Sequence, residues 1–105
     1  MDRLSPREIA DRLAAGDELI MLDVREPWEF EIAHLDQSVN IPMQQIPAVA
    51  DTLAKDVPTV VICHHGMRSF EVAKFLESNG FSNLINLEGG IEAWACNVDP
   101  SLARY

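Results

Sequence analysis

The chain has 105 residues, of which 48% are hydrophobic and 24% are charged, so it can form one domain with a buried core over residues 1–105. Its 17 acidic residues outnumber 8 basic ones and give a net charge of −9, which argues against nucleic acid or an anionic membrane surface as a partner. No apolar run approaches the roughly 20 residues of a membrane span. Two cysteines without a hydrophobic signal segment predict free thiols and a cytoplasmic location.

The N-terminal part of the chain contains clear signals for a helix and a strand. Ser5 and Glu8 form a potential capping box around a proline, which predicts a helix that ends near Gly16. Residues 18–24 predict a buried strand, because the apolar residues within this stretch are continuous rather than alternating. A turn into a short helix follows at 25–30.

The rest of the chain continues this alternation of strands and helices. A wide apolar stripe makes residues 69–79 the clearest helix. Strand–helix alternation predicts a parallel sheet with helices on both faces, where functional sites form at the carboxyl ends of the strands. We expect strands at 39–42, 59–63 and 84–87, and helices at 46–53, 69–79 and 91–95.

The most informative segment is the loop that follows the strand ending at Ile62. It reads Cys63-His64-His65-Gly66-Met67-Arg68-Ser69. Loop amides, a helix N-terminus and a guanidinium group all favour negative charge at one point, which suits a thiolate nucleophile at Cys63. The alternative is a buried cysteine that only fills space in the core.

Other loop residues have candidate roles around this thiol. Arg68 is positioned to pair with an anionic substrate, or else with an acidic neighbour. Gly66 permits a backbone conformation that turns N–H groups inward, and Ser69 is a candidate helix cap. His64 and His65 either polarise the thiol or substrate or are solvated, and their spacing does not support a metal site.

Three residues outside the loop also need an interpretation. Asp23 and Arg25 are two apart on a strand, so they share a face and most simply form a structural ion pair. Cys96 is either a resolving thiol or, as we favour, an incidental small residue.

Three stretches of the chain together resemble the rhodanese family of sulfurtransferases. Residues 22–30, followed by 33–35 and 40–42, are similar to its N-terminal signature, residues 60–69 to its active-site loop, and residues 87–94 to its C-terminal signature. The resemblance implies an α/β fold with a central parallel five-stranded sheet and helices on both faces. It also implies that Cys63 is a nucleophile that cycles through a persulfide.

The resemblance further implies a reaction and its participants. Sulfur would pass from thiosulfate or a similar donor to Cys63, and then to cyanide, a thiol or a protein acceptor. The loop from Cys63 to Arg68, with His64, His65, Gly66 and Met67 between them, would bind the substrate. No metal or organic cofactor is expected.

Two other interpretations remain open at this point. One is a rhodanese-like module that carries a persulfide or binds a partner with little small-molecule turnover. The other is a cysteine-dependent phosphatase or arsenate reductase. The loop from Cys63 to Arg68 has the sulfurtransferase length, one residue shorter than the loop of the related phosphatases. Residues 36–38 depart from the family pattern, which affects a nearby turn rather than the thiol loop.

Overall fold

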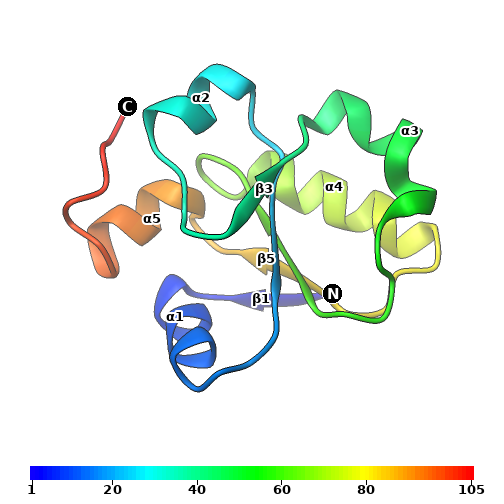
Figure 1. Cartoon of the computed structure of the whole chain (residues 1–105), viewed down its shortest axis with the longest axis horizontal. Helices are drawn as coiled ribbons and strands as arrows, with labels where there is room; N and C mark the ends of the chain where they lie inside the picture. Colours follow the sequence, from blue (N-terminus) through cyan, green and yellow to red (C-terminus); the bar gives the residue numbers. More distant parts are fainter.

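The computed structural model describes all 105 residues and contains one five-stranded sheet in the order β1-β5-β4-β2-β3 (Figure 1). Every neighbouring pair of strands is parallel. The strands β4 and β2 are buried along almost their whole length and are mostly apolar, as expected for strands that are covered on both faces. The strands are β1 (Asp2–Leu4), β2 (Ile20–Asp23), β3 (Ser38–Asn40), β4 (Thr59–Ile62) and β5 (Leu84–Leu87).

Helices cover both faces of this sheet, so the expected five-stranded α/β architecture is confirmed. On one face, Ile9 of α1 and Trp94 of α5 pack in the same core cluster as Val60 and Ile62. On the other face, α3 and α4 pack against the side of β4 that carries Val61 and, beyond the strand, the candidate nucleophile. The helices are α1 (Pro6–Ala14), α2 (Pro27–Ile32), α3 (Ile46–Val49), α4 (Met67–Ser78) and α5 (Gly90–Asn97).

The structure corrects three expectations about local structure. Strand β1 was not expected, because its short sequence has no apolar run, yet it pairs with β5 through Asp2 and Ile85. The helix expected at 46–53 is interrupted, and α3 lies between two 3-10 turns at Met43–Gln45 and Ala50–Thr52. Helix α4 begins two residues earlier than expected, which puts the whole thiol loop closer to its N-terminus.

None of the helices combines the length and apolar character that crossing a bilayer demands. Because all the strands are parallel, the carboxyl ends of β2, β4 and β5 lie at one edge of the molecule. The segments that follow these strands contain the residues described next.

Candidate active site

Cys63 directly follows β4 and is only 1% exposed. Its Sγ accepts a hydrogen bond from the backbone N–H of Gly66 at 3.0 Å. Gly66 has φ +97°, and a side chain there would come within 3.1 Å of the Gly89 nitrogen. Glycine is therefore required where the loop folds back over the sulfur. Gly66 thus has a backbone conformation that other residues resist, as its place in the loop predicts.

Ser69 connects the thiol to a buried polar chain rather than capping α4. Gly66 is the residue at the cap position, and Ser69 lies within the helix, fully buried. The Cys63 thiol donates to Ser69 Oγ at 3.3 Å, and the serine hydroxyl donates to Asn86 Oδ1 at 2.5 Å. The role expected for Ser69 is wrong, because the earlier helix start moves it from the helix end to the inner face.

Asn86 fixes the position of the loop from the neighbouring strand β5. Its Nδ2 donates to the Gly66 carbonyl at 3.2 Å and to Glu88 Oε2 at 2.6 Å. Asn86 belongs to no motif that the sequence shows, although an amide in the otherwise apolar strand Leu84–Leu87 is a signal. A buried polar side chain without a partner is costly, so such a residue indicates a hydrogen-bond network.

The first turn of α5 binds two backbone carbonyl groups of the thiol loop. Ile91 N–H donates to the carbonyl of Cys63 at 2.9 Å, and Glu92 N–H donates to the carbonyl of His64 at 3.1 Å. Gly90 permits this approach, since a Cβ there would lie 2.6 Å from the Cys63 carbonyl oxygen. Two loop carbonyls thus replace the ligand or water that would otherwise satisfy the helix N-terminus.

Arg68 forms a two-point ion pair with Glu29 of α2. Its Nη1 and Nη2 lie 2.7 and 2.9 Å from the two carboxylate oxygens. The hydrogen bond from Arg68 is the main reason that the pKa of Glu29 falls to about 2, and burial opposes it. The same bond raises the pKa of Arg68, so both groups are charged at neutral pH. Arg68 was expected to pair either with an anionic substrate or with an acidic neighbour, and in the structure it pairs with the acidic neighbour Glu29.

Tyr105 links this ion pair to a second one beneath it. The tyrosine hydroxyl donates to Glu29 Oε2 at 2.7 Å and accepts from Arg25 Nη1 at 2.8 Å. Arg25 and Asp23 are both fully buried and 2.7 Å apart, which confirms the expected ion pair. Glu29 and Tyr105 were not recognised in the sequence, because their partners are 39 and 80 residues away.

The two loop histidines stack on one another and on Tyr105. The His64 ring lies 4.0 Å from the ring of His65 and 4.0 Å from the ring of Tyr105. Burial, followed by the charge of His65, lowers the pKa of His64, which favours the neutral imidazole at neutral pH. His65 and Met67 are exposed to solvent beside the thiol. Nowhere in the molecule do three or more His, Cys, Asp or Glu side chains gather in an arrangement that could hold a metal ion.

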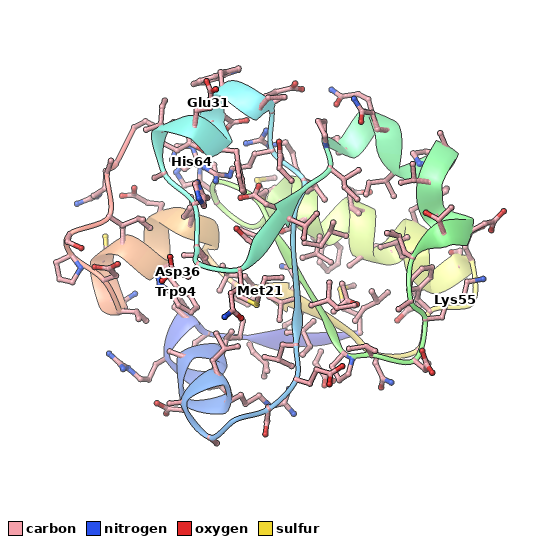
Figure 2. The ribbon with its side chains drawn as sticks, viewed as in Figure 1. Met21, Glu31, Asp36, Lys55, His64 and Trp94 are labelled. Atoms are coloured by element: carbon pink, nitrogen blue, oxygen red, sulfur yellow. The ribbon has the colours of Figure 1, made fainter.

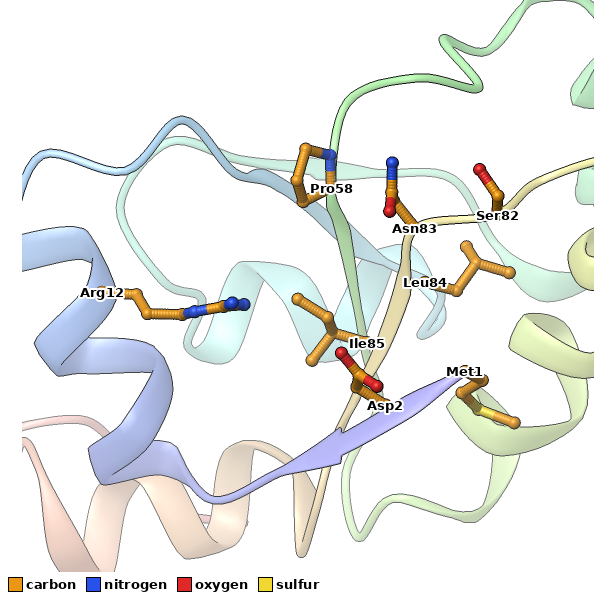
Figure 3. Close-up of a pocket in the computed structure, with 8 residues that line it drawn as sticks. All are labelled: Met1, Asp2, Arg12, Pro58, Ser82, Asn83, Leu84 and Ile85. Atoms are coloured by element: carbon orange, nitrogen blue, oxygen red, sulfur yellow. The ribbon is translucent and has the colours of Figure 1, made fainter.

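Two further features lie apart from this site. Cys96 is an exposed free thiol on α5. A cavity of about 110 Å³ lies at the amino ends of the strands, opposite the edge that carries the thiol loop, and Figure 3 shows the residues around it. It is lined by Met1, Asp2, Arg12, Pro58, Ser82, Asn83, Leu84 and Ile85.

Comparison with known proteins gives a consistent result. Residues 5–96 match the family model described as a rhodanese-like domain. The putative sulfurtransferase YtwF of Bacillus subtilis is 39% identical over 97 residues, which cover 92% of this chain and 93% of YtwF. A rhodanese-like domain protein from Staphylococcus aureus has a similar structure, with a TM-score of 0.86, 28% identity and coverage of 100% and 99% of the two chains.

A longer relative matches over a part of its length. The probable adenylyltransferase/sulfurtransferase MoeZ of Mycobacterium tuberculosis is 38% identical over 105 residues. The match covers 97% of this chain but only 26% of MoeZ. The chain therefore spans about a quarter of that protein.

Proposed function

The chain belongs to the rhodanese family of sulfurtransferases, and on this premise we propose that Cys63 carries a sulfur atom from thiosulfate or a similar donor to cyanide, a thiol or a protein acceptor. The observation that carries the proposal is the Gly66 N–H, which donates to the Cys63 sulfur at 3.0 Å. A backbone donor at this point stabilises negative charge on sulfur without any rearrangement of the loop.

The first half of the reaction loads Cys63. Its thiolate attacks the outer sulfur of thiosulfate, a new S–S bond forms, and the S–S bond of the donor breaks. Sulfite leaves with the bonding electron pair, so Cys63 becomes a persulfide. Thiolate is the nucleophilic form of cysteine, and the Gly66 amide favours it.

The second half returns the enzyme to its starting state. An acceptor such as cyanide attacks the terminal sulfur of the persulfide and forms thiocyanate, or a thiolate attacks it and becomes a persulfide itself. The bond between the two sulfur atoms on Cys63 breaks, and Cys63 leaves as a thiolate. The Gly66 N–H stabilises the leaving thiolate as it stabilised the attacking one.

The remaining loop residues surround this exchange. Arg68 lies beside the loop in its ion pair with Glu29, and the charge on Cys63 adds to the effect of Glu29 in raising the pKa of Arg68. His64, His65 and Met67 line the approach to the sulfur. We assign Gly66 and Arg68 to binding the anionic donor, with Arg68 exchanging Glu29 for the donor when it does so.

Both cysteines are free thiols in the structure. The reaction requires the Cys63 thiol to be reduced before each cycle, so we place the activity in a reducing compartment, the cytoplasm.

The decisive experiment is intact mass measurement after treatment with thiosulfate. Wild type gains the mass of one sulfur atom, and cyanide removes it with formation of thiocyanate. Cys63→Ser gains none, whereas Cys96→Ser, which removes the exposed thiol on α5, loads like the wild type. A Cys63→Ser variant that still gains sulfur, with a Cys96→Ser variant that does not, would move the nucleophile to Cys96 and refute the proposal.

A further inference from the structure

We infer that the outer face of α2, beside the thiol loop, docks a protein acceptor whose cysteine lies between apolar residues within a basic segment. The inference rests on the proposed function, because it names the class of acceptor for the Cys63 persulfide. The docking face consists of Trp28 and Ile32 of α2 and Met67 at the start of α4.

The docking face is unusually apolar for a solvent-exposed surface. Met67 is 78% exposed and Trp28 is 59% exposed, which makes them the two most exposed large hydrophobic side chains of the molecule. Ile32 is 42% exposed and lies one helical turn after Trp28, on the same side of α2. Tryptophan and methionine are enriched in protein interfaces, and tryptophan above all supplies binding energy there.

The ion pair between Glu29 and Arg68 joins the two helices that carry these side chains. Trp28 directly precedes Glu29, and Met67 directly precedes Arg68, so the 2.7 Å contact joins the start of α2 to the start of α4. Trp28 also packs edge to face against Tyr105, with ring centres 5.9 Å apart, and Tyr105 stacks on His64, the neighbour of Cys63. The docking face therefore adjoins the nucleophile.

The charges around the docking face favour a basic partner. Helix α2 carries no lysine or arginine, and Glu31 on this helix and Glu26 directly before it are not held in an ion pair as Glu29 is. Glu31 projects from the outer side of α2 (Figure 2). Arg68 and Arg25 are already neutralised by Glu29 and Asp23, and the chain as a whole carries a net charge of −9. Lysine and arginine on the partner would meet complementary charge and speed the encounter.

The burial of Cys63 explains why docking would matter for transfer. Its side chain is 1% exposed, so an acceptor thiol must be held close to the loop to reach the terminal sulfur. The acceptor thiolate attacks that sulfur, the new S–S bond forms on the acceptor, and Cys63 leaves as a thiolate. Holding the two reactants together by the docking face makes this step effectively intramolecular.

The test measures sulfur transfer from preloaded Cys63 persulfide to defined synthetic peptides, followed by mass spectrometry. One peptide has leucine on both sides of its cysteine and lysines outside them, a second has glutamates in place of the lysines, and a third has serines in place of the leucines. We expect the lysine–leucine peptide to accept sulfur about tenfold faster than either of the others at low salt. Salt should reduce its advantage over the glutamate peptide.

Variants of the protein then locate the docking face. Trp28→Ala and Ile32→Gln should each slow transfer to the lysine–leucine peptide several-fold and leave transfer to cyanide unchanged. Phe75→Ala is the matched control, because Phe75 is also a partly exposed hydrophobic residue but lies about two turns further along α4. It should change neither rate.

The outcomes separate this inference from the proposed function. If Cys63 takes up no sulfur from any donor, both fail. If it loads normally but transfers at equal rates to all three peptides, or if Trp28→Ala and Ile32→Gln transfer like the wild type, the docking face is refuted and the sulfurtransferase proposal stands.

Discussion

The backbone N–H of Ile91 donates to the carbonyl oxygen of Cys63 at 2.9 Å, so the first turn of α5 fixes the backbone of the proposed nucleophile. Glu92 holds the carbonyl of His64 in the same way. In a trans peptide the N–H of the next residue points opposite to the carbonyl. The anchored carbonyls therefore turn the N–H groups of His64 and His65 away from α5. Residues 87–94, which resemble the C-terminal signature of the family, thus hold the active-site loop in place through backbone hydrogen bonds.

The close approach at Gly90 predicts a large effect of a single methyl group. In Gly90→Ala the new Cβ would collide with the carbonyls of His64 and Cys63, and the positive φ of +64° would add backbone strain. We expect a loss of about 2 to 4 kcal/mol of unfolding free energy, measured by urea denaturation. Sulfur loading from thiosulfate should fall at least tenfold, because the loop must move.

Gly16→Ala is the control for the backbone term alone. Gly16 has a similar φ of +90° but has no atom within 4 Å of the position of a Cβ. It should lose about 1 kcal/mol and load sulfur like the wild type. Equal loading by Gly90→Ala and wild type would show that α5 does not hold the loop in place.

The parts of this molecule that depend on local sequence pattern could be predicted from the sequence. The alternation of apolar runs and helical stripes was sufficient for the parallel sheet, and Asp23 and Arg25 pair as their spacing indicates. Local pattern failed at β1, whose residues are held by pairing with β5 and not by their own propensity. It failed again at 46–53, where one regular helix was expected but α3 ends at Val49 and a 3-10 turn follows at Ala50–Thr52.

In the candidate site, too, the residues of the local motif could be predicted from the sequence, whereas their distant partners could not. Cys63 and Gly66 lie where their loop motif places them, because both positions depend on the turn that follows β4. The partners of the loop come from elsewhere in the chain: Asn86 from β5, Glu29 from α2 and Tyr105 from the C-terminal segment. No spacing rule connects residues that meet only after the sheet has formed, so these partners required the structure.

Ser69→Ala should destabilise the protein more than an ordinary surface change. It removes the acceptor of the Cys63 thiol and leaves the buried Asn86 Oδ1 without the donor 2.5 Å away. A buried polar atom that loses its partner costs about 1 to 3 kcal/mol. Ser78→Ala, on the same helix but exposed, should cost under about 0.5 kcal/mol in the same denaturation experiment. Indistinguishable stabilities would mean that the Cys63–Ser69–Asn86 chain contributes nothing.

Glu29 should make the stability of the protein sensitive to acid. Its pKa in the folded protein is about 2, below its ordinary value of 4.5, mainly because of the hydrogen bond from Arg68. The stabilisation is thus complete above pH 4.5 and is lost as the pH falls through the interval toward 2. Glu29→Gln should cost about 1 kcal/mol at neutral pH, because solvent screens the partly exposed Arg68. Its deficit relative to wild type should shrink below pH 4.5.

Urea denaturation at a series of pH values measures this difference. Glu31→Gln, which removes an exposed carboxylate from the same helix, is the matched control and should leave the pH dependence of wild type in place. A Glu29→Gln variant with the same acid dependence as wild type would contradict a stabilising pair between Glu29 and Arg68.

Tyr105 is the only tyrosine of the chain, so its ionisation can be followed directly by the ultraviolet absorbance of phenolate. Burial is the main reason that the pKa of Tyr105 rises to about 12; the hydrogen bond from Arg25 opposes it and the one to Glu29 adds to it. Because the pKa in the folded protein exceeds the ordinary value of 10, the stability that this group contributes is complete below pH 10 and is lost as the pH rises through about 12. Glu29→Gln should lower the phenol pKa, since the hydrogen bond to Glu29 and the charge of Glu29 both raise it. A phenol that ionises near 10 while circular dichroism still reports native structure would show that Tyr105 does not rest on Glu29 and His64 in solution.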